Sequence, residues 1–432
     1  MVNDTLFGFT MQGHGTPRQH ELLHTKEEGA RAVVLDLTQE ILQRSLEAEV
    51  TRQLGEPRSR RSDAQIAWHC RRCGTRLQRH IRRNGHYRRR LTVREGTISL
   101  RVPEIRCRCG GYADVAWDTL TPRLRYWIDV ELDSIRHYLA GTSYRLVADA
   151  ASTQSRVHIS HLQGWRAMQR AGGTGREKER GKGKPNLGPC PRAVILDDVH
   201  VPVAGEDLVF LIAVTHDGRV LLLDGPTSRT TGSWAQALEC LSDHGIGPGA
   251  GLVAAVADGD SAIREAVALV WPRVVMQRCV WHILDQVAHE VVEVYGPESP
   301  DGERIVEEAR RIFWHDRRKP GAMAEAARLL QAFLAAHKGQ RWAETVRRAF
   351  VEGTEYLRTP GVPRTNGRAE RVIRELRRRT KVMDGFKSKR GAAHFAVIWS
   401  LWNNERRRLA HERRQLQRPR NLKTPHPHPK LP

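Results

Sequence analysis

The feature that most restricts the fold is a series of strand-like segments in the second half of the chain. Three apolar runs follow one another closely at 192–203, 207–218 and 219–228, and the last two meet at the turn Asp217-Gly218. Helical and strand patterns then alternate, with a helix at 233–243, a strand at 251–260, a helix at 262–270 and a short strand at 273–276. This order predicts an α/β core built on one sheet.

Three meandering strands followed by alternating helix and strand form the order of an RNase H-like fold, which places carboxylates on its first and fourth strands side by side. Asp197 and Asp258 fall on those strands, 61 residues apart (258 − 197). Asp198 points to the opposite face of the strand from Asp197, so only one of the two can be a ligand. We favour Asp197 and assign Asp198 to a turn or cap. Asp260 is a candidate N-cap of the following helix.

A third carboxylate is expected from a helix predicted over 364–382, RTNGRAERVIRELRRRTKV. Glu370 lies at the edge of its apolar face, which consists of Ala369, Val372, Ile373, Leu376 and Thr380. Glu375 lies about 140° further round the helix and is not expected to share the site. Taken alone, Glu370 has a simpler interpretation as an ion-paired surface residue. With Asp197 and Asp258 it completes a carboxylate set suited to two Mg2+ or Mn2+ ions and to phosphoryl transfer.

Arginines cover the remaining surface of the same helix. We expect them to hold DNA phosphates near the site. The residues concerned are Arg368, Arg371, Arg374 and Arg378, with Arg377, Arg379 and Lys381 beside them.

Four of the seven cysteines form two close pairs, Cys70/Cys73 and Cys107/Cys109, with 33 residues between the inner members (107 − 73 − 1). Four thiolates on two short loops suit a structural, tetrahedral Zn2+ site. The alternatives are unmetallated thiols and a site that includes His69. Between the pairs, alternating apolar residues flank a turn at 94–97 and predict a β-hairpin. We therefore expect a zinc-ribbon-like region over 61–120.

The N-terminal region 1–60 is predicted to contain a loose arm, residues 1–25, and one helix over 26–54. The apolar stripe of that helix comprises Val34, Leu37, Ile41, Leu42, Leu46 and Val50.

Residues 121–170 are predicted to form a helix-turn-helix. Helical periodicity covers 122–139, 143–151 and 157–168, and the last two stretches are separated by Ser152-Thr153-Gln154-Ser155. Any three-helix bundle would give the same pattern. As a DNA-binding motif, it would offer its second helix to a groove through Arg156, His158 and Arg166, together with His161 and Gln163.

The rest of the chain divides by composition and periodicity. Residues 171–190 are rich in Gly, Lys and Arg and predict a flexible linker. The core is expected in two parts, 191–282 and 361–410, separated by an all-helical insertion over 283–360. The second part contains a helix over 391–406 that buries Phe395, Ile398, Trp399 and Trp402. The basic, Pro-rich residues 411–432 are expected to be disordered.

The charge balance points to a polyanionic partner. The chain of 432 residues carries 71 Lys and Arg against 49 Asp and Glu, a net charge of +22, and such a surplus is typical of nucleic-acid-binding proteins. A merely solvated basic surface is the alternative. No apolar run reaches the length of a membrane span, and seven cysteines with two close pairs favour metal binding over disulfides. We expect a cytoplasmic, nucleoid-associated protein with no membrane partner.

Several stretches resemble the Mutator-like superfamily of bacterial insertion-sequence DDE transposases. They are ILQRSLEAEVTRQLGE (41–56), NGHYRRRLTVREGTISLRVPEIR (84–106), VILDDVHVPV (194–203), VADGDSAIREAVALVWPRVVMQRCVWH (256–282) and the helix at 364–382. The segment QRCVWH is similar to the C-x2-H signature of this superfamily, here Cys279 and His282, which would support the active site. Taken alone, these two are more often core residues. The resemblance implies the triad Asp197, Asp258 and Glu370.

The sequence therefore predicts a metal-dependent transposase that cuts transposon ends and transfers them into target DNA. Its partners would be double-stranded DNA with terminal inverted repeats, target DNA, and a second copy of the chain, since two ends must be brought together. The alternatives are a catalytically inactive, sequence-specific DNA-binding protein and an RNase H-like nuclease or resolvase.

Overall fold

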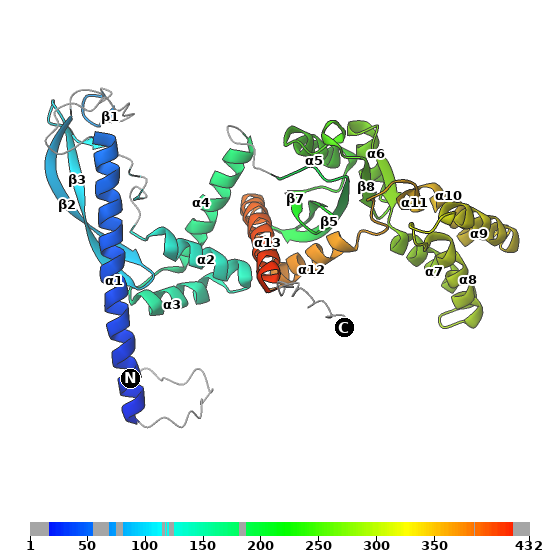
Figure 1. The fold of residues 1–432 in the computed structure, drawn as a ribbon, viewed down its shortest axis with the longest axis horizontal. Coiled ribbons are helices and arrows are strands. Elements are labelled where there is room, and N and C mark those ends of the chain that lie inside the picture. Colours follow the sequence, from blue (N-terminus) through cyan, green and yellow to red (C-terminus); the bar gives the residue numbers. More distant parts are fainter. Residues whose placement is uncertain are drawn as a thin grey trace, which may run out of the picture. The chain divides into compact units, whose positions relative to one another are not determined.

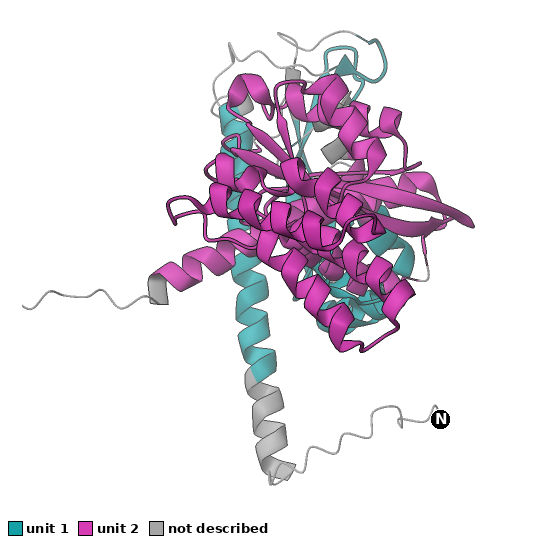
Figure 2. Cartoon of the chain, turned by 90° about the vertical axis from the view of Figure 1, so that its right-hand side faces the viewer, with its two compact units in different colours: residues 1–167 teal, residues 168–432 magenta. Residues whose placement is uncertain are grey.

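The computed structural model describes residues 17–54, 69–74, 81–114, 117, 119–120, 125–180, 187–383 and 385–417. The chain divides into two compact units, residues 1–167 and 168–432 (Figure 2). The cysteine pairs lie in the first unit and the candidate carboxylates in the second. Among the helices of the described residues, none has both the length and the apolar character needed to cross a membrane.

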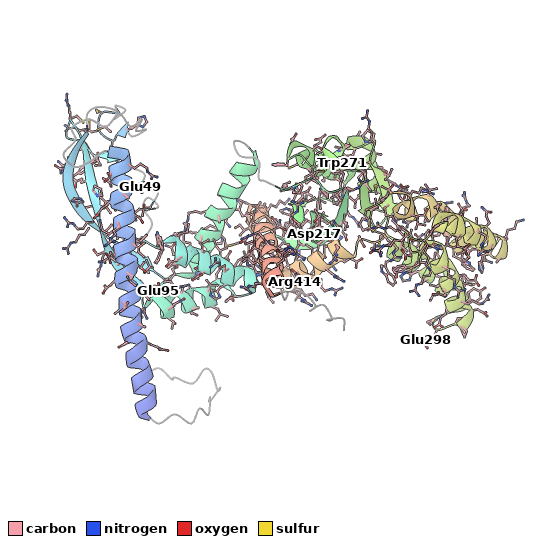
Figure 3. All side chains as sticks on the ribbon, viewed as in Figure 1. Glu49, Glu95, Asp217, Trp271, Glu298 and Arg414 are labelled. Carbon is pink, nitrogen blue, oxygen red and sulfur yellow. The ribbon has the colours of Figure 1, made fainter. Side chains whose placement is uncertain are left out.

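The first unit is built on a long helix and a hairpin. Helix α1 (Pro17–Leu54) lies beside strands β2 (Ile81–Val93) and β3 (Gly96–Cys107) (Figure 1). The hairpin is confirmed, with Val93 paired to Gly96 across a two-residue turn. The short strands β1 (His69–Cys70) and β4 (Ala113–Asp114) pair antiparallel. Glu49, labelled in Figure 3, is buried and accepts hydrogen bonds from the backbone N–H and hydroxyl of Thr119.

Helix α1 differs from its prediction at both its start and its apolar face. It begins at Pro17 rather than at 26, so part of the predicted loose arm is helical. Leu42, Leu46 and Val50 are buried, but the first half of the predicted stripe is exposed, namely Val34, Leu37 and Ile41. Polar contacts take over beside the hairpin, where the side chains of Gln39 and Gln43 accept from the backbone N–H groups of Ser99 and Arg101. The helix thereby satisfies donors on the open edge of β3.

Three helices follow the hairpin: α2 (Ile128–Ala140), α3 (Tyr144–Ser155) and α4 (His161–Arg180). The predicted break at 152–155 is wrong, because α3 continues to Ser155. The Ser155 hydroxyl donates to the carbonyl of Ala151, and the Ser152 hydroxyl accepts from the backbone N–H of Ile159. These serines thus stabilise the end of the helix and the chain after it. Arg156, with φ 54°, ends α3 in the left-handed conformation.

Helix α4 also runs further than predicted, through the first ten residues of the expected linker 171–190. Within the second unit, a Cβ at Gly172 would lie 2.4 Å from the Cβ of His394. The His394 ring and the Gln169 side chain are 2.7 Å apart. Gly172 therefore permits close packing against α13 (Lys389–Gln417) instead of providing flexibility. Residues 181–186 of the expected linker lie outside the described residues.

The second unit is organised around a five-stranded mixed sheet in the order β7-β6-β5-β8-β9. Strands β5 (Ala193–Val203), β6 (Glu206–Val214) and β7 (Val220–Thr227) are antiparallel neighbours. Strands β8 (Ala254–Ala257) and β9 (Val275–Arg278) are parallel to β5. The α/β sheet that the strand pattern predicts is therefore present, with β5 at its centre.

Helices cover this sheet. Helices α5 (Thr231–Asp243) and α6 (Ser261–Val270), with the short η1 (Pro248–Ala250) between them, share a core with the strands. At the end of α6 the indole N–H of Trp271, labelled in Figure 3, donates to the Ser242 hydroxyl of α5. Helix α12 (Gly367–Lys381) lies along β5, and α13 packs on β7 (Figure 1). Helix α13 continues to Gln417, so the first residues of the predicted disordered tail 411–432 are helical.

Between β9 and α12 every element is a helix. These are α7 (Val280–Tyr295), α8 (Pro300–Phe313), α9 (Ala322–Ala336), α10 (Arg341–Gly353) and the short α11 (Glu355–Arg358). The chain leaves and returns at one place, because the backbone N–H of Val280 donates to the carbonyl of Arg364 at 3.2 Å. This helical insertion therefore has a closed neck next to α12.

Candidate active site

Three carboxylates reach one region of the second unit from separate elements. Asp197 lies near the middle of β5, Asp258 directly follows β8, and Glu370 lies in the first turn of α12. Burial raises the pKa of Asp197 from 3.8 to about 7, against the effect of the Asp198 backbone N–H, and the negative charges of Asp258, Asp198 and Glu370 raise it further. The chain has thus gathered acidic groups that repel one another, which is the arrangement a bound cation would relieve.

An open pocket of about 560 Å³ lies over this cluster. Its lining includes the carboxylates of Asp197, Asp198 and Glu370 and the ring of His282. Further along α12 the lining is cationic, with Arg374, Arg377, Arg378 and Lys381. A phosphate-bearing ligand would meet cations here beside carboxylates that are able to hold metal.

A buried asparagine links two parts of the cluster. Asn366, 0% exposed, donates from Nδ2 to Oδ2 of Asp197 at 3.1 Å, and its Oδ1 lies 3.1 Å from the thiol of Cys279. The backbone carbonyl of Asn366 also accepts from the N–H of Glu370. Cys279 in turn donates its backbone N–H to Ala257, the residue before Asp258. This Asn366–Cys279 pair therefore joins the positions of all three carboxylates.

The ring of His282 lies against the same cluster. One ligand atom each from Cys279, His282 and Glu370 lies within 4.8 Å of the other two. Nδ1 of His282 is buried and has no hydrogen-bond partner in the described part of the chain. A buried ring nitrogen without a partner next to a carboxylate fits a site that takes up a cation or a protonated group. Burial raises the pKa of the Cys279 thiol, which keeps it in the neutral, hydrogen-bonding form.

One arginine also enters the acidic cluster. Arg229, between β7 and α5, places Nε 2.8 Å from Oδ2 of Asp198 and its NH2 group 3.2 Å and 3.7 Å from the carboxylates of Asp260 and Asp258. Asp260 is the N-cap of α6, as the sequence predicts, and accepts from Ala262 and Ile263. Arg229 thus neutralises carboxylates on the side of the cluster away from Asn366.

Asp197 and Asp198 have different surroundings, although both line the pocket. The carboxylate of Asp197 accepts from Asn366 and is close enough to Glu370 to be repelled by it. Asp198 is 8% exposed and paired with Arg229. Strand alternation alone does not separate the two residues, but their partners do. Glu375 lies elsewhere, 3.7 Å from the guanidinium of Arg407 on α13.

The expected DNA-binding arginines of α12 are exposed, namely Arg368, Arg371, Arg374 and Arg378. Arg379 is an exception to the predicted basic surface because it is buried. In the first unit, Arg166 is exposed on α4, but Arg156 and His158 lie in the connection between α3 and α4 and not on the predicted second helix. Arg156 there pairs with Glu28 of α1. The predicted second helix begins at His161 and not at residue 157, because α3 ends later than predicted.

The four cysteines of the first unit form a thiol cluster. Their sulfur atoms all lie within 4.8 Å of one another, with Cys70 to Cys109 at 3.4 Å and Cys73 to Cys107 at 3.8 Å. Tetrahedral Zn–S bonds of about 2.3 Å place sulfurs about 3.8 Å apart. A Cβ at Gly111 would lie 2.8 Å from Sγ of Cys70. These observations fit a zinc site whose loops leave no room for a side chain at Gly111.

Sequence patterns missed Asn366 and Arg229. Asn366 lies within the predicted helix 364–382 and directly before the observed start of α12, where Asn is an ordinary helix-start residue. Nothing local indicates that its side chain points to a strand 169 residues away. Arg229 stands in a loop with common turn residues around it.

The chain is similar to known proteins over most of its length. A family model described as Transposase, Mutator family, matches residues 14–404. The transposase for insertion sequence element IS406 of Burkholderia multivorans is 28% identical over 323 residues, which cover 70% of this chain and 76% of that protein. The family match includes the thiol cluster, the three carboxylates and the whole helical insertion.

Proposed function

Because the chain belongs to the Mutator family of transposases, we propose that it cuts the ends of a transposon and transfers them into target DNA through Asp197, Asp258 and Glu370. The observation that carries this proposal is the convergence on Asp197, whose pKa is raised to about 7 by burial and then by the charges of Asp258, Asp198 and Glu370. A bound cation would relieve the repulsion among like charges assembled in this way. The mixed sheet with β5 next to β8 supports an RNase H-like core.

Asp197, Asp258 and Glu370 would hold two Mg2+ or Mn2+ ions. When bound, such ions activate an attacking oxygen and stabilise the leaving oxygen of a phosphodiester. The chain itself does the positioning. Asn366 fixes the orientation of the Asp197 carboxylate, and the cations Arg374, Arg377 and Arg378 bind the phosphates on either side of the reacting one.

The first unit has a structural and a binding role in this proposal. Its thiol cluster would hold one Zn2+ ion through Cys70, Cys73, Cys107 and Cys109, which fixes the end of the hairpin. Helices α2 to α4 would contact the terminal inverted repeats, with Arg166 as the exposed candidate on α4. Two transposon ends require at least a dimer on DNA. A DNA substrate would bring the protein to the nucleoid.

The test is a cleavage assay on a labelled fragment that carries the DNA flanking the gene, with Mg2+ or Mn2+ added. The proposal expects strand cleavage at a repeat boundary. Cleavage should disappear in Asp197→Asn, Asp258→Asn and Glu370→Gln while DNA binding persists. Glu375→Gln is the matched control, because Glu375 lies on the same helix and pairs with Arg407 outside the site.

The two alternatives give different results in that assay. Sequence-specific binding with no cleavage by the unmutated protein would indicate a catalytically inactive DNA-binding protein and would contradict the proposal. Cleavage that follows DNA branching instead of the repeat boundary would indicate a nuclease or resolvase.

A further inference from the structure

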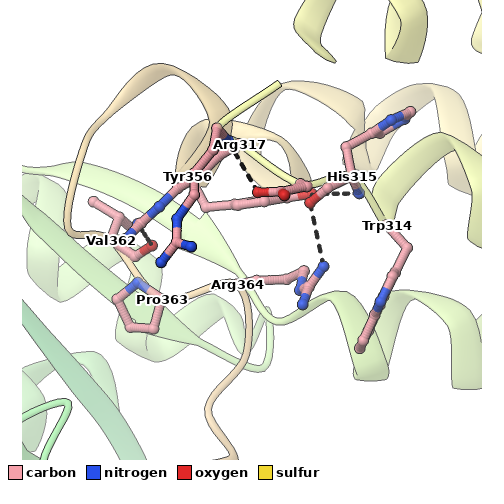
Figure 4. A pocket seen from close by; sticks show the side chains of 9 residues that line it. Trp314, His315, Arg317, Tyr356, Val362, Pro363 and Arg364 are labelled. Carbon is pink, nitrogen blue, oxygen red and sulfur yellow. Dashed lines mark hydrogen bonds between the residues drawn. The ribbon is translucent and has the colours of Figure 1, made fainter. Parts of the chain in front are cut away.

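A second pocket, separate from the acidic cluster, opens at the neck of the helical insertion. It has a volume of about 510 Å³ and lies where the loop after α8 meets the segment that leads into α12. Figure 4 shows its lining side chains, among them Trp314, Arg317, Tyr356, Val362, Pro363 and Arg364. One part of this neck pocket is thus cationic, and the other is aromatic and aliphatic.

The cations of the neck pocket are held by uncharged partners. The guanidinium carbon of Arg364 lies 3.7 Å from the ring centre of Trp314 and 5.6 Å from that of Tyr356, and NH1 donates to the carbonyl of His315. Arg317 donates to the carbonyl of Val362 (Figure 4). Aromatic faces and carbonyl groups fix the orientation of a guanidinium but leave its net charge uncompensated.

The other arginines of the insertion are different. Eight of them form ion pairs with carboxylates: Arg304, Arg310, Arg311, Arg328, Arg341, Arg347, Arg348 and Arg358. Within the described residues, Arg317, Arg318 and Arg364 have no such pair. The one acid that lines the pocket, Asp316, accepts from the backbone N–H of Arg318. Uncompensated positive charge in the insertion is therefore concentrated at the neck pocket.

The aromatic wall is rigid. The hydroxyl of Tyr356 donates to the carbonyl of Phe313 at 2.8 Å and accepts from the backbone N–H of His315 at 3.0 Å. The ring of Trp314 also contacts the ring of Trp281 edge to face, with 5.5 Å between the ring centres. A preformed wall of this kind reduces the entropy cost of binding.

We propose that the neck pocket binds one nucleotide of the DNA substrate, with its phosphate on Arg317, Arg318 and Arg364 and its sugar and base against the partly exposed Trp314 and Pro363. The volume lies in the range of about 300–1,000 Å³ that is typical of ligand pockets and far exceeds that of a lone phosphate. Uncompensated guanidinium groups bind phosphate, and flat aromatic and apolar surfaces bind bases.

The position of the pocket relates this nucleotide to the reaction. Arg364 is two residues before Asn366, which holds Asp197, and Trp281 directly precedes His282 of the acidic pocket. The inference rests on the proposed DNA substrate but not on catalysis. A nucleotide in the neck pocket would fix the strand next to the reacting phosphodiester.

The first test compares two tandem arginine substitutions in the full-length protein. Arg317→Ala with Arg318→Ala removes uncompensated cations, whereas Arg347→Ala with Arg348→Ala removes the same charge from exposed residues paired with Glu344. Binding of fluorescent flanking DNA is measured by anisotropy against salt concentration, without added Mg2+. We expect the neck variant to bind roughly tenfold more weakly and its salt slope to fall by about 1–2, and the control to change little.

Equal effects of the two double variants would overturn the inference, because the loss would then follow from net charge alone. Thermal unfolding of both variants checks that the fold is retained. If the unmutated protein binds no DNA, the proposed function fails. If it binds and cleaves while the neck variant does so equally well, only the neck pocket is wrong.

The second test identifies the nucleotide. Flanking DNA substituted with 5-iodouracil is irradiated with the protein, and crosslinked peptides are mapped by mass spectrometry. Crosslinks to Trp314 that disappear in the neck variant support a base in the pocket. Crosslinks that map only outside the pocket would overturn the assignment of a nucleotide.

Discussion

The thiol cluster and the carboxylate cluster both bring ligand atoms together from separate segments, but by different means. The four thiols come from two turns at the ends of the hairpin, and backbone N–H groups of Arg72 and Gly111 point at the sulfurs of Cys70 and Cys109. The carboxylates come from β5, β8 and α12, and their repulsion is balanced by Asn366 and Arg229. A site built from local turns depends on backbone shape, whereas one built across a fold depends on its buried supporting side chains.

The largest expected effect comes from removing one negative charge from the carboxylate cluster. Glu370→Gln keeps the shape and removes the charge that a metal needs, so cleavage should fall by about 10³-fold or more, or about 4 kcal/mol of transition-state stabilisation. DNA binding should stay within about twofold. The loss of cleavage is measured under single-turnover conditions on labelled flanking DNA. Glu375→Gln should cleave normally, and equal losses in the two variants would mean that Glu370 has no special role.

The next largest effect comes from adding a side chain to the backbone beside the thiol cluster. Gly111→Ala places a methyl group within 2.8 Å of Sγ of Cys70, so bound zinc should be lost and the first unit destabilised by about 2–4 kcal/mol. Metal analysis and thermal unfolding measure the two results. Gly29→Ala is the matched control, since no atom lies within 4 Å of its new Cβ. Full zinc content in Gly111→Ala would contradict the dependence of the zinc site on the close packing at Gly111.

A smaller effect is expected from changing the side chains that support the carboxylates. Asn366→Ala removes the donor to Asp197, and we expect cleavage to fall by about 10–50-fold with a higher Mn2+ concentration at half-maximal rate. Cys279→Ala should show the same loss of cleavage to a smaller extent. Cys279→Ser should retain most activity because a hydroxyl can replace the thiol as donor to Asn366. A loss that no Mn2+ concentration changes, or a serine variant as poor as the alanine variant, would indicate a purely structural role.

The smallest effect concerns pH. With a pKa of about 7 in the folded chain against 3.8 ordinarily, Asp197 keeps a proton between about pH 4 and 7 that the unfolded chain has lost. Its contribution to stability is therefore present at low pH and is lost as pH rises through 7. Without divalent metal, Asp197→Asn should unfold about 2–4 °C above the unmutated protein at pH 8 and at the same temperature near pH 4. Calorimetry at both pH values measures this.

Added Mn2+ provides the control for that prediction. Metal competes with the proton on Asp197, so Mn2+ should stabilise the unmutated protein more at pH 8 than at pH 6. It should have little effect on Asp197→Asn at either pH. A stabilisation that is independent of both pH and Asp197 would place the metal elsewhere.

The parts of the molecule that local sequence determines were predictable. The hairpin, the cysteine pairs and the five strands are each predicted by a pattern of alternation or spacing within about a dozen residues. Asp260 likewise follows a local capping rule. Such features depend on neighbours in sequence, so the pattern alone contains the information.

Features that depend on distant partners were not predictable. Glycine at 172 indicates a linker by composition, yet it permits contact with His394. Ser152 and Ser155 indicate a break, yet their hydroxyl groups bond to the backbone of α3 and of the chain after it. Asn366 and Arg229 gain their roles only from Asp197 and Asp198, which lie on another element. Each of these misses is a tertiary contact that overrides a local preference.

The closed neck of the helical insertion determines how far the insertion can change without disturbing the core. Its two ends are joined by the hydrogen bond between Val280 and Arg364, so α7 to α11 form a side branch whose removal leaves the sheet and α12 connected across one short gap. The branch still contacts the sheet, because the buried side chain of Gln277 on β9 hydrogen-bonds to Gly353 and Tyr356. A shorter or foreign helical module that keeps these contacts and His282 of α7 should leave Asp197, Asp258 and Glu370 where they are, and would change which DNA the proposed chemistry reaches.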